Sequence, residues 1–167
     1  SVSQVDLFKT HYEDLLFSPI ELPCCTQTKQ DDDVLAVIAR LMEAHADETC
    51  ALIVEPLVQG AAGMRMHSAY FLQKLHALSR QFNIHFIADE IAVGFGRTGT
   101  LFACEQADIT PDFMCVSKGL TGGYLALSAV LTTDTIYNLF YADHSTGKGF
   151  LHSHTYAGNP LACAAAV

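Results

Sequence analysis

The chain has 167 residues, of which 9 are Lys or Arg and 18 are Asp or Glu, so its formal net charge is −9 at pH 7. This length allows one domain with a substantial core, and the scattered basic residues argue against binding nucleic acid through a basic surface. No apolar run approaches the roughly 20 residues that cross a bilayer, and the opening SVSQVDLFKT lacks the pattern of a signal peptide. We therefore expect a cytoplasmic protein.

The six cysteines and eight histidines do not predict a metal site. The adjacent pair Cys24 and Cys25 has no second pair that would complete a zinc site. The cysteines stand mostly in apolar contexts and are typical of small, reduced hydrophobic residues. His152 and His154, with His144 nearby, do not have the spacing of known metal motifs. We predict no bound metal ion.

Residues 1–30 contain Pro19 and Pro23 and no sustained hydrophobic period, which predicts an irregular lead-in with one short helical piece at about 11–17. The acidic triplet 31–33 favours the start of a helix, because acidic side chains cap and complement a helix N-terminus. The same triplet lacks the alternating ligands and the glycine of a calcium loop. The expected buried face of this helix comprises Val34, Val37, Ile38, Leu41 and Met42.

Residues 51–57 form a continuous apolar run, which predicts a strand buried on both faces that brings Glu55 and Gln59 to its C-terminal end. A helix is predicted over 68–82, and a second strand ends at Asp89. The helix has a core stripe of Phe71, Leu75, Leu78 and Phe82. Such an order predicts an α/β fold with a parallel sheet and right-handed crossovers, which binds ligands beyond the C-terminal ends of its strands.

The stretch 113–123, FMCVSKGLTGG, places Lys118 at the end of a third apolar run, with three glycines in the next five residues. One interpretation is a strand that reaches the surface and continues in a flexible turn. The other is a lysine amine held at the sheet edge to form a Schiff base, with glycines that let the backbone pass close to a cofactor. Asp89 precedes Lys118 by 29 residues, about one strand-helix-strand unit. A lysine and a carboxylate at equivalent strand ends are what pyridoxal phosphate chemistry requires.

The remaining segments carry weaker signals. The glycine-rich stretch 94–99 around Arg97 has neither dinucleotide-binding nor P-loop spacing, and we assign Arg97 no catalytic role. A strand is predicted over 125–131 and a helix from Thr133 to about 141, followed by a polar loop over 142–150. Asn159 and Pro160 predict the cap and first turn of a last helix. Thr155, just upstream, closes a turn in the ordinary case.

Four strings in this order resemble the large domain of the class III aminotransferases, which are pyridoxal phosphate enzymes of fold type I: EPLVQGAAGM (55–64), ADEIAVGFGRTG (88–99), SKGLTGGY (117–124) and HSHTYAGNPLACAAA (152–166). The resemblance implies a three-layer α/β fold with a mostly parallel sheet flanked by helices. It also implies that Lys118 holds the cofactor as an imine and moves the substrate proton, while Asp89 keeps the ring nitrogen protonated.

The resemblance extends to further residues of the site. Ile91 would pack on a face of the ring, although an ordinary core isoleucine fits the same position, and Gln59 would approach the ring oxygen. Thr155 would donate to the cofactor phosphate of the neighbouring subunit, which implies a homodimer with a shared active site. Glu55 would steady the site or pair with a substrate-facing arginine. Gly122 and Gly123 would lie beside the substrate or just behind it.

Within this class, the runs LTGGYLALSAVLTT and HSHTYAGNPLACA are most similar to the members that serve biotin biosynthesis. This implies S-adenosylmethionine as amino donor, 8-amino-7-oxononanoate as acceptor and 7,8-diaminononanoate as product. Ala126 stands where proline is expected, and Val93 where threonine is expected. The alternatives are a class III enzyme acting on ornithine or 4-aminobutyrate, an aminomutase for glutamate semialdehyde, and a folded module without catalytic activity.

Members of this class are more than twice as long. They have an upstream segment with a phosphate-binding loop and a ring-stacking aromatic residue, and a downstream small domain with an arginine for the substrate carboxylate. We therefore expect residues 1–167 to be part of the large domain, with 1–30 as lead-in and 31–167 as the α/β core. Alone, the chain is expected to be a poor catalyst.

Overall fold

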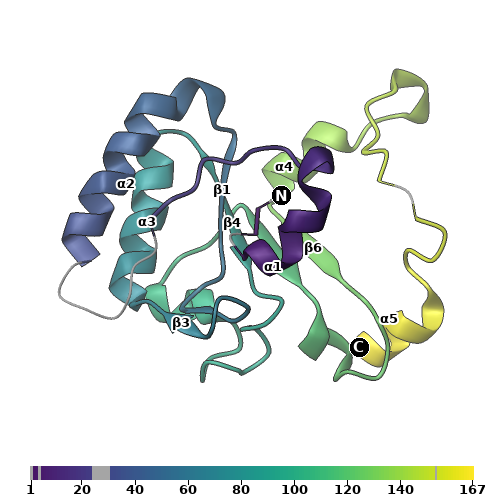
Figure 1. Cartoon of the computed structure of the whole chain (residues 1–167). Coiled ribbons are helices and arrows are strands. Elements are labelled where there is room, and N and C mark those ends of the chain that lie inside the picture. Colours follow the sequence, from purple (N-terminus) through teal and green to yellow (C-terminus); the bar gives the residue numbers. More distant parts are fainter. Residues whose placement is uncertain (1, 4, 24–30, 153) are drawn as a thin grey trace.

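A four-stranded sheet forms the centre of the computed structural model, which describes residues 2, 3, 5–23, 31–152 and 154–167 (Figure 1). The strands are β1 (Ala51–Val54), β4 (His85–Asp89), β5 (Phe113–Val116) and β6 (Ala129–Thr132), in the order β1-β4-β5-β6. The first three are parallel, and β6 runs antiparallel to β5. A separate antiparallel pair joins β2 (Val58–Gln59) to β3 (Arg65–Met66). The predicted α/β class with a mostly parallel sheet is confirmed, whereas the strand predicted over 125–131 begins only at Ala129.

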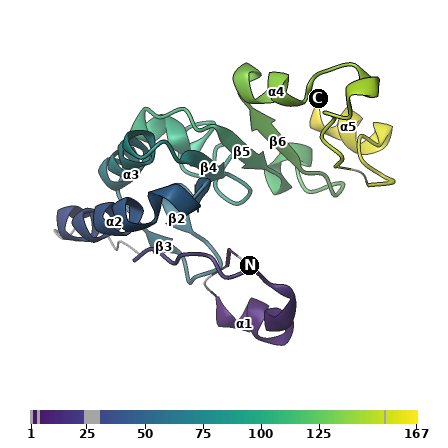
Figure 2. The same ribbon diagram turned by 90° about the horizontal axis from the view of Figure 1, so that it is seen from above.

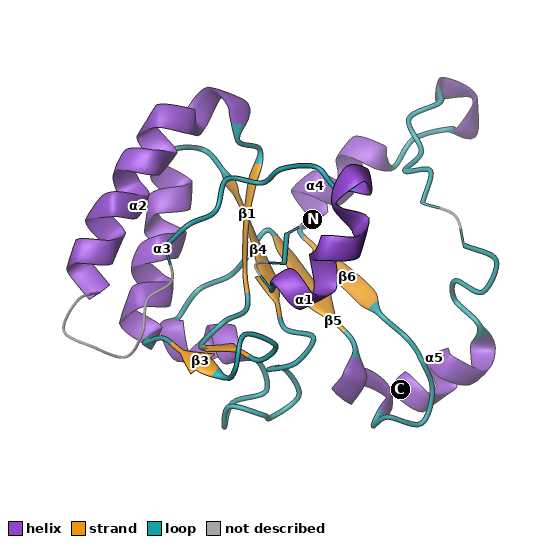
Figure 3. Cartoon of the chain, in the orientation of Figure 1, coloured by secondary structure: helices purple, strands orange, loops and turns teal. Residues whose placement is uncertain are grey.

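Two long helices, α2 (Asp31–His45) and α3 (Ala69–Gln81), lie side by side next to β1 and β4 (Figures 1 and 3). The short helices are α1 (Asp6–Lys9), α4 (Asp134–Phe140) and α5 (Pro160–Ala166). The 3-10 helices are η1 (Thr10–Leu15), η2 (Ala46–Glu48), η3 (Ala103–Ala107), η4 (Lys118–Thr121) and η5 (His144–Thr146). Seen from above, α1 stands clear of the sheet (Figure 2). The short helical piece of the lead-in is thus present, although it begins five residues earlier than predicted. No helix in the described part of the chain is long and apolar enough to cross a membrane.

One face of the sheet carries the core. Leu52 of β1 and Phe86 of β4 are paired and buried, and they pack with the apolar stripes of α2 and α3. Ile53 points to the other face, where it is 39% exposed. The prediction that this strand is buried on both faces is therefore wrong for this chain. The helix predicted over 68–82 is confirmed, and Ser68 caps it by accepting a hydrogen bond from the Phe71 N–H at 2.9 Å.

The buried stripe of α2 agrees with the predicted one only in part. Its members are Leu35, Ile38 and Met42, whereas Val37 is 41% exposed. The prediction is confirmed for Ile38 and Met42, and Val34 packs against the core, but Leu35 was missed and Val37 was wrongly included. The adjacent cysteines 24 and 25 lie outside the described residues.

Asp112 ties the entrance of β5 to β4 and α3. Its carboxylate accepts hydrogen bonds from the Phe86 N–H at 2.7 Å and from Arg80 Nη1 at 2.9 Å. Its own N–H donates to the Phe86 carbonyl at 2.9 Å, and its carbonyl accepts from Thr132 Oγ1 at 2.9 Å. Burial pushes the pKa of this carboxyl up, but the Phe86 N–H and the Arg80 guanidinium outweigh burial and hold it below its usual range.

We predict that Asp112→Ala lowers the free energy of unfolding by about 2 kcal/mol at pH 7, because the buried Phe86 N–H loses its acceptor. Since the folded-state pKa is depressed, this contribution is present above the unfolded pKa of about 3.9 and is lost as the pH falls through the folded value. Urea unfolding between pH 7 and pH 2 measures both effects. The wild type and Asp112→Ala should converge at the acidic end, while the exposed Asp14→Ala should match the wild type throughout. A constant gap between wild type and Asp112→Ala would contradict this explanation.

Candidate active site

The C-terminal ends of β4 and β5 bring the two predicted key residues to one edge of the sheet. Asp89 is the last residue of β4, and its Cα pairs with that of Cys115 in β5. Neighbouring strands lie about 4.8 Å apart, so the backbone of Asp89 is one strand spacing from the end of β5, the strand that leads to Lys118. The pKa of the Cys115 thiol is raised by burial and then by the negative charge of Asp89, as expected for neighbours on one face.

Asp89 points to the face of the sheet that α2 and α3 leave uncovered. Side chains alternate along a strand, and Phe86 and Ala88 of β4 are fully buried on the helix-covered face. Asp89 is half-buried, and its Oδ1 accepts a hydrogen bond from the Ile91 N–H at 3.1 Å. This bond fixes the carboxylate against the next turn of backbone. Ile91 is likewise half-buried.

Lys118 follows β5 after one residue and has an unusual backbone. Its φ of 44° lies in the left-handed region, which costs a non-glycine residue free energy and is concentrated at functional sites. Its side chain is exposed. Two hydroxyl groups fasten the flanks of the turn, because Ser117 Oγ donates to the Leu127 carbonyl at 2.7 Å and Thr121 Oγ1 donates to the Leu125 carbonyl at 2.6 Å.

The glycines after Lys118 serve different purposes. Gly122 and Gly123 have φ values of 61° and 85°, so the chain there needs residues without a Cβ. Gly119 is instead required by a close approach. A Cβ built on it would lie 2.9 Å from both Cβ and Cδ2 of Phe95. Phe95, in the loop after β4, thus presses directly on the lysine turn.

We predict that Gly119→Ala destabilises the folded chain by about 1–3 kcal/mol, because the added methyl group overlaps Phe95 and the lysine turn must shift. Thermal and urea unfolding measure the loss. Gly149→Ala is the matched control, since a Cβ there would meet no heavy atom within 4 Å. Equal stability of the two variants would contradict this prediction, because it would show that Phe95 can move away from the added methyl group without loss of folding free energy.

The segment after β1 reaches the same edge. Glu55 Oε2 accepts a hydrogen bond from the Gly60 N–H at 2.9 Å, and a Cβ on Gly60 would lie 3.9 Å from Cβ of Ala92. The strand predicted to continue to 57 ends at Val54, because Leu57 turns the chain with a φ of 63°. Gln59 consequently lies in β2, half-buried and paired with Arg65.

Thr155 is placed apart from the other candidates. It is exposed in the turn that precedes α5, and no contact described for the chain joins it to Lys118 or Asp89. The cap of α5 is the predicted one, since Asn159 Oδ1 accepts from the Ala162 N–H at 2.9 Å. Helix α5 itself packs against η4, which contains Lys118 (Figure 1).

One residue of this edge was missed from the sequence. Glu90 is fully buried, and its carboxylate accepts hydrogen bonds from the N–H groups of Ala103 at 3.0 Å and Cys104 at 2.9 Å. Alternation along β4 could have revealed it, because a residue next to an outward Asp89 must point inward. The pKa of the Cys104 thiol is strongly raised, first by burial and then by the charge of Glu90.

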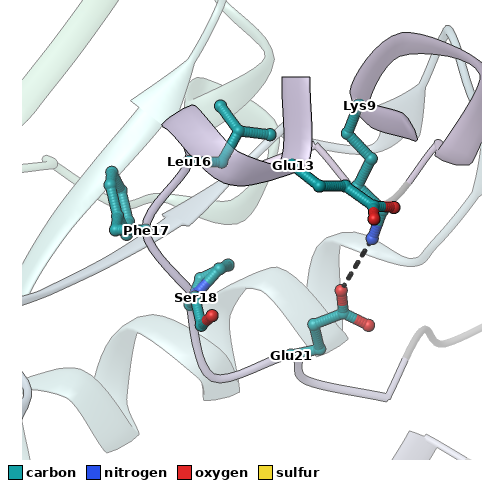
Figure 4. Close-up of a pocket in the computed structure, with 7 residues that line it drawn as sticks. Lys9, Glu13, Leu16, Phe17, Ser18 and Glu21 are labelled. Carbon is teal, nitrogen blue, oxygen red and sulfur yellow. Dashed lines mark hydrogen bonds and ion pairs between the residues drawn. The ribbon is translucent and has the colours of Figure 1, made fainter. Parts of the chain in front are cut away.

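A hollow on the surface of the described chain lies away from this edge. A depression of about 360 Å³ is formed by the lead-in segment, where Lys9 Nζ and Glu21 Oε1 are 3.3 Å apart (Figure 4). None of the predicted site residues lines it. Among the described residues, no three His, Cys, Asp or Glu side chains gather in a way that would hold a metal ion.

Comparison with known proteins identifies relatives over the whole chain. The family model described as Aminotransferase class-III matches residues 4–167. The adenosylmethionine-8-amino-7-oxononanoate aminotransferase of Helicobacter pylori is 50% identical over 166 residues, which are 99% of this chain and 38% of that protein. The enzyme of the same name from Synechococcus elongatus is 46% identical over 175 residues, covering 100% of this chain and 40% of that protein.

Solved structures agree. The crystal structure of adenosylmethionine-8-amino-7-oxononanoate aminotransferase from Methanocaldococcus jannaschii matches with a TM-score of 0.87 and 38% identity over 96% of this chain and 37% of that one. The ornithine aminotransferase of Plasmodium yoelii matches with a TM-score of 0.69 and 34% identity over 83% of this chain and 34% of that one. The chain therefore spans about 38% of the length of the curated relatives that it matches.

Proposed function

Because this chain belongs to the class III aminotransferases, we propose that the open edge formed by β4 and β5 binds pyridoxal phosphate, with Lys118 as the attachment point and Asp89 beside the ring nitrogen. The observation that carries the proposal is the backbone of Lys118. A lysine held at φ 44° between two fastened flanks, one strand from a half-buried carboxylate, is a strained arrangement that a simple surface turn does not need.

The residues at this edge fit the cofactor. Its aldehyde needs an amine, its basic ring nitrogen needs a carboxylate, and both are present at adjacent parallel strand ends on an uncovered face. When bound, the cofactor withdraws electrons from the carbon that exchanges its amino group. Lys118 would hold the aldehyde, and its free amine would carry a proton to or from the substrate carbon. Asp89, oriented by the Ile91 N–H, holds the proton on the ring nitrogen.

The neighbouring residues complete the proposed site. Ile91 packs on the ring, and Gln59 approaches it from the hairpin that follows β1. Glu55, held by the Gly60 N–H, steadies this hairpin or pairs with a substrate-facing arginine. Gly122 and Gly123 leave room for the substrate next to Lys118. Thr155, which is exposed before α5, would donate to the cofactor phosphate of the neighbouring subunit in a homodimer, as the family resemblance implies.

The names of the relatives extend the proposal to the substrates. We propose that the amino group moves from S-adenosylmethionine to the ketone of 8-amino-7-oxononanoate, giving 7,8-diaminononanoate in biotin biosynthesis, in the cytoplasm. Among the solved structures, the enzyme of this name from Methanocaldococcus jannaschii matches with a TM-score of 0.87 over 96% of the chain, compared with 0.69 over 83% for the ornithine aminotransferase. Enzymes acting on ornithine or 4-aminobutyrate remain the second candidates, and a folded module without activity is the third.

We predict that borohydride reduction after titration with pyridoxal phosphate attaches the cofactor to Lys118, and that Lys118→Ala abolishes the visible absorbance band. Peptide mapping locates the adduct. The exposed Lys148→Ala is the matched control and should keep both the band and the adduct. Adducts spread evenly over Lys74, Lys118 and Lys148 would show that the chain has no formed site and would favour the module without activity.

A second prediction concerns the amino donor. In the cofactor-loaded protein, S-adenosylmethionine should discharge the visible band in a single turnover, because the relatives' names specify this donor. Ornithine and 4-aminobutyrate at the same concentration should react at least about tenfold more slowly, which corresponds to a difference of about 1.4 kcal/mol between transition states. Stopped-flow absorbance measures the three rates. Faster discharge by ornithine would reverse the order of the first two candidates.

A further inference from the structure

Glu90 is a charged residue type at a fully buried position, directly between Asp89 and Ile91. Its two carboxylate oxygens accept hydrogen bonds from consecutive backbone N–H groups, those of Ala103 and Cys104, at the start of η3. A buried carboxylate without such donors would be costly, so these two bonds are what allow the residue to be buried. They also fasten the end of β4 to a segment 13 residues further along the chain.

The backbone of Glu90 is held as firmly as its side chain. Its N–H donates to the Cys115 carbonyl of β5 at 2.9 Å, which extends the β4–β5 pairing beyond Asp89. Its carbonyl accepts from the Gly94 N–H at 2.9 Å, and a Cβ on Gly94 would lie only 2.8 Å from that carbonyl oxygen. Glu90 is thus fixed to β5, to the loop after β4 and to η3 simultaneously.

A continuous set of contacts leads from η3 to the lysine turn. Phe102 precedes η3 and meets Phe95 edge-on, with 5.6 Å between ring centroids. Phe95 in turn presses on Gly119, the residue after Lys118. Phe95 has a left-handed backbone with a φ of 58°, so this loop, like the lysine turn, is held in a strained conformation by its surroundings.

We propose that Glu90 is a positioning residue, which fixes the Asp89 carboxylate relative to Lys118 by anchoring the intervening loop to η3. The role rests on the proposed function, since it matters for catalysis only if Asp89 and Lys118 hold the cofactor. In this role Glu90 contacts neither the ring nitrogen nor the aldehyde of the cofactor. It acts through the peptide that carries Asp89 on one side and through Phe95 on the other.

The test compares Glu90→Gln with Glu105→Gln and Asp89→Asn. Glutamine keeps the size of the buried side chain but offers only one acceptor to two N–H donors. Glu105 is the matched control, because it is exposed in the same η3 and accepts a single N–H, that of Phe102, at 2.9 Å, which an amide oxygen also accepts. Glu90→Asp, one methylene shorter, is the second variant if Glu90→Gln does not fold.

The first readout is hydrogen exchange of the chain without cofactor. In Glu90→Gln we expect about tenfold faster exchange of the Ala103 or Cys104 amide, as for the loss of one hydrogen bond to a buried carboxylate. The coupling also requires faster exchange in 117–121, whereas Glu105→Gln should leave this segment unchanged. Acceleration confined to 103–104 would overturn the proposal, because it would show an anchor with no effect on the lysine turn.

The second readout is the pH titration of the absorbance of bound pyridoxal phosphate, which reports the protonation of the groups that Asp89 and Lys118 contact. Asp89→Asn sets the direction of the displacement, and Glu90→Gln should move the midpoint the same way, by at least about threefold in proton affinity. A folded Glu90→Gln with a wild-type midpoint would contradict positioning. If the wild type captures no cofactor at Lys118, the proposed function fails, and the exchange pattern alone decides whether Glu90 couples the two segments.

Discussion

The parallel pairing of β4 with β5 is the constraint on which the rest of this structure depends. It brings the C-terminal ends of the two strands, and with them Asp89 and Lys118, to the same edge of the sheet. A residue with a buried carboxylate stands at each end of the pairing. Asp112 accepts the Phe86 N–H where the two strands begin to pair, and Glu90 sits just beyond Asp89 where they part. Both use side-chain oxygens to satisfy buried backbone donors, the Phe86 N–H of β4 for Asp112 and two N–H groups of η3 for Glu90.

The two carboxylates differ in what they do for the site. Asp112 lies at the edge opposite the candidate site and is paired with Arg80, which is half exposed, so water moderates this interaction. Glu90 is enclosed by backbone donors and has a direct neighbour in Asp89. The first therefore acts mainly on the stability of the sheet. The second acts on the geometry of a loop that contacts both strand ends.

The sequence predicted those parts of the fold that depend on local chemistry. Thr133 and Asn159, at the predicted helix starts, accept the hydrogen bonds that their residue types favour there. Placing Asp89 and Lys118 at one edge needed only the order of strands and helices, since parallel strands end on the same side.

What the sequence could not show depends on neighbours distant along the chain. The exposure of Ile53 and Val37 follows from which face the helices cover, and hydrophobicity alone does not reveal it. The hairpin containing Gln59 depends on the left-handed Leu57, a residue type that rarely adopts this conformation. The buried role of Glu90 has no local signal, because its donors lie 13 and 14 residues away. Ile91, Gln59 and Thr155 have positions in the fold, and their roles stay predictions.

Solvent exposure of the sheet face beside Asp89 weakens the charge–charge interactions that this carboxylate can make. On the same face of the sheet as Asp89, Val130 of β6 is 62% exposed and Ile53 of β1 is 39% exposed. Two unit charges 4 Å apart interact by about 1 kcal/mol in water but by about 4 kcal/mol at the effective dielectric constant of a partly buried site. If Asp89 contacts the ring nitrogen as proposed, that interaction would therefore be several-fold stronger once this face is covered. Since the ring is flat and would displace water from this face, binding of the cofactor would contribute part of that cover, so that under the proposed function binding and activation of the ring would reinforce each other.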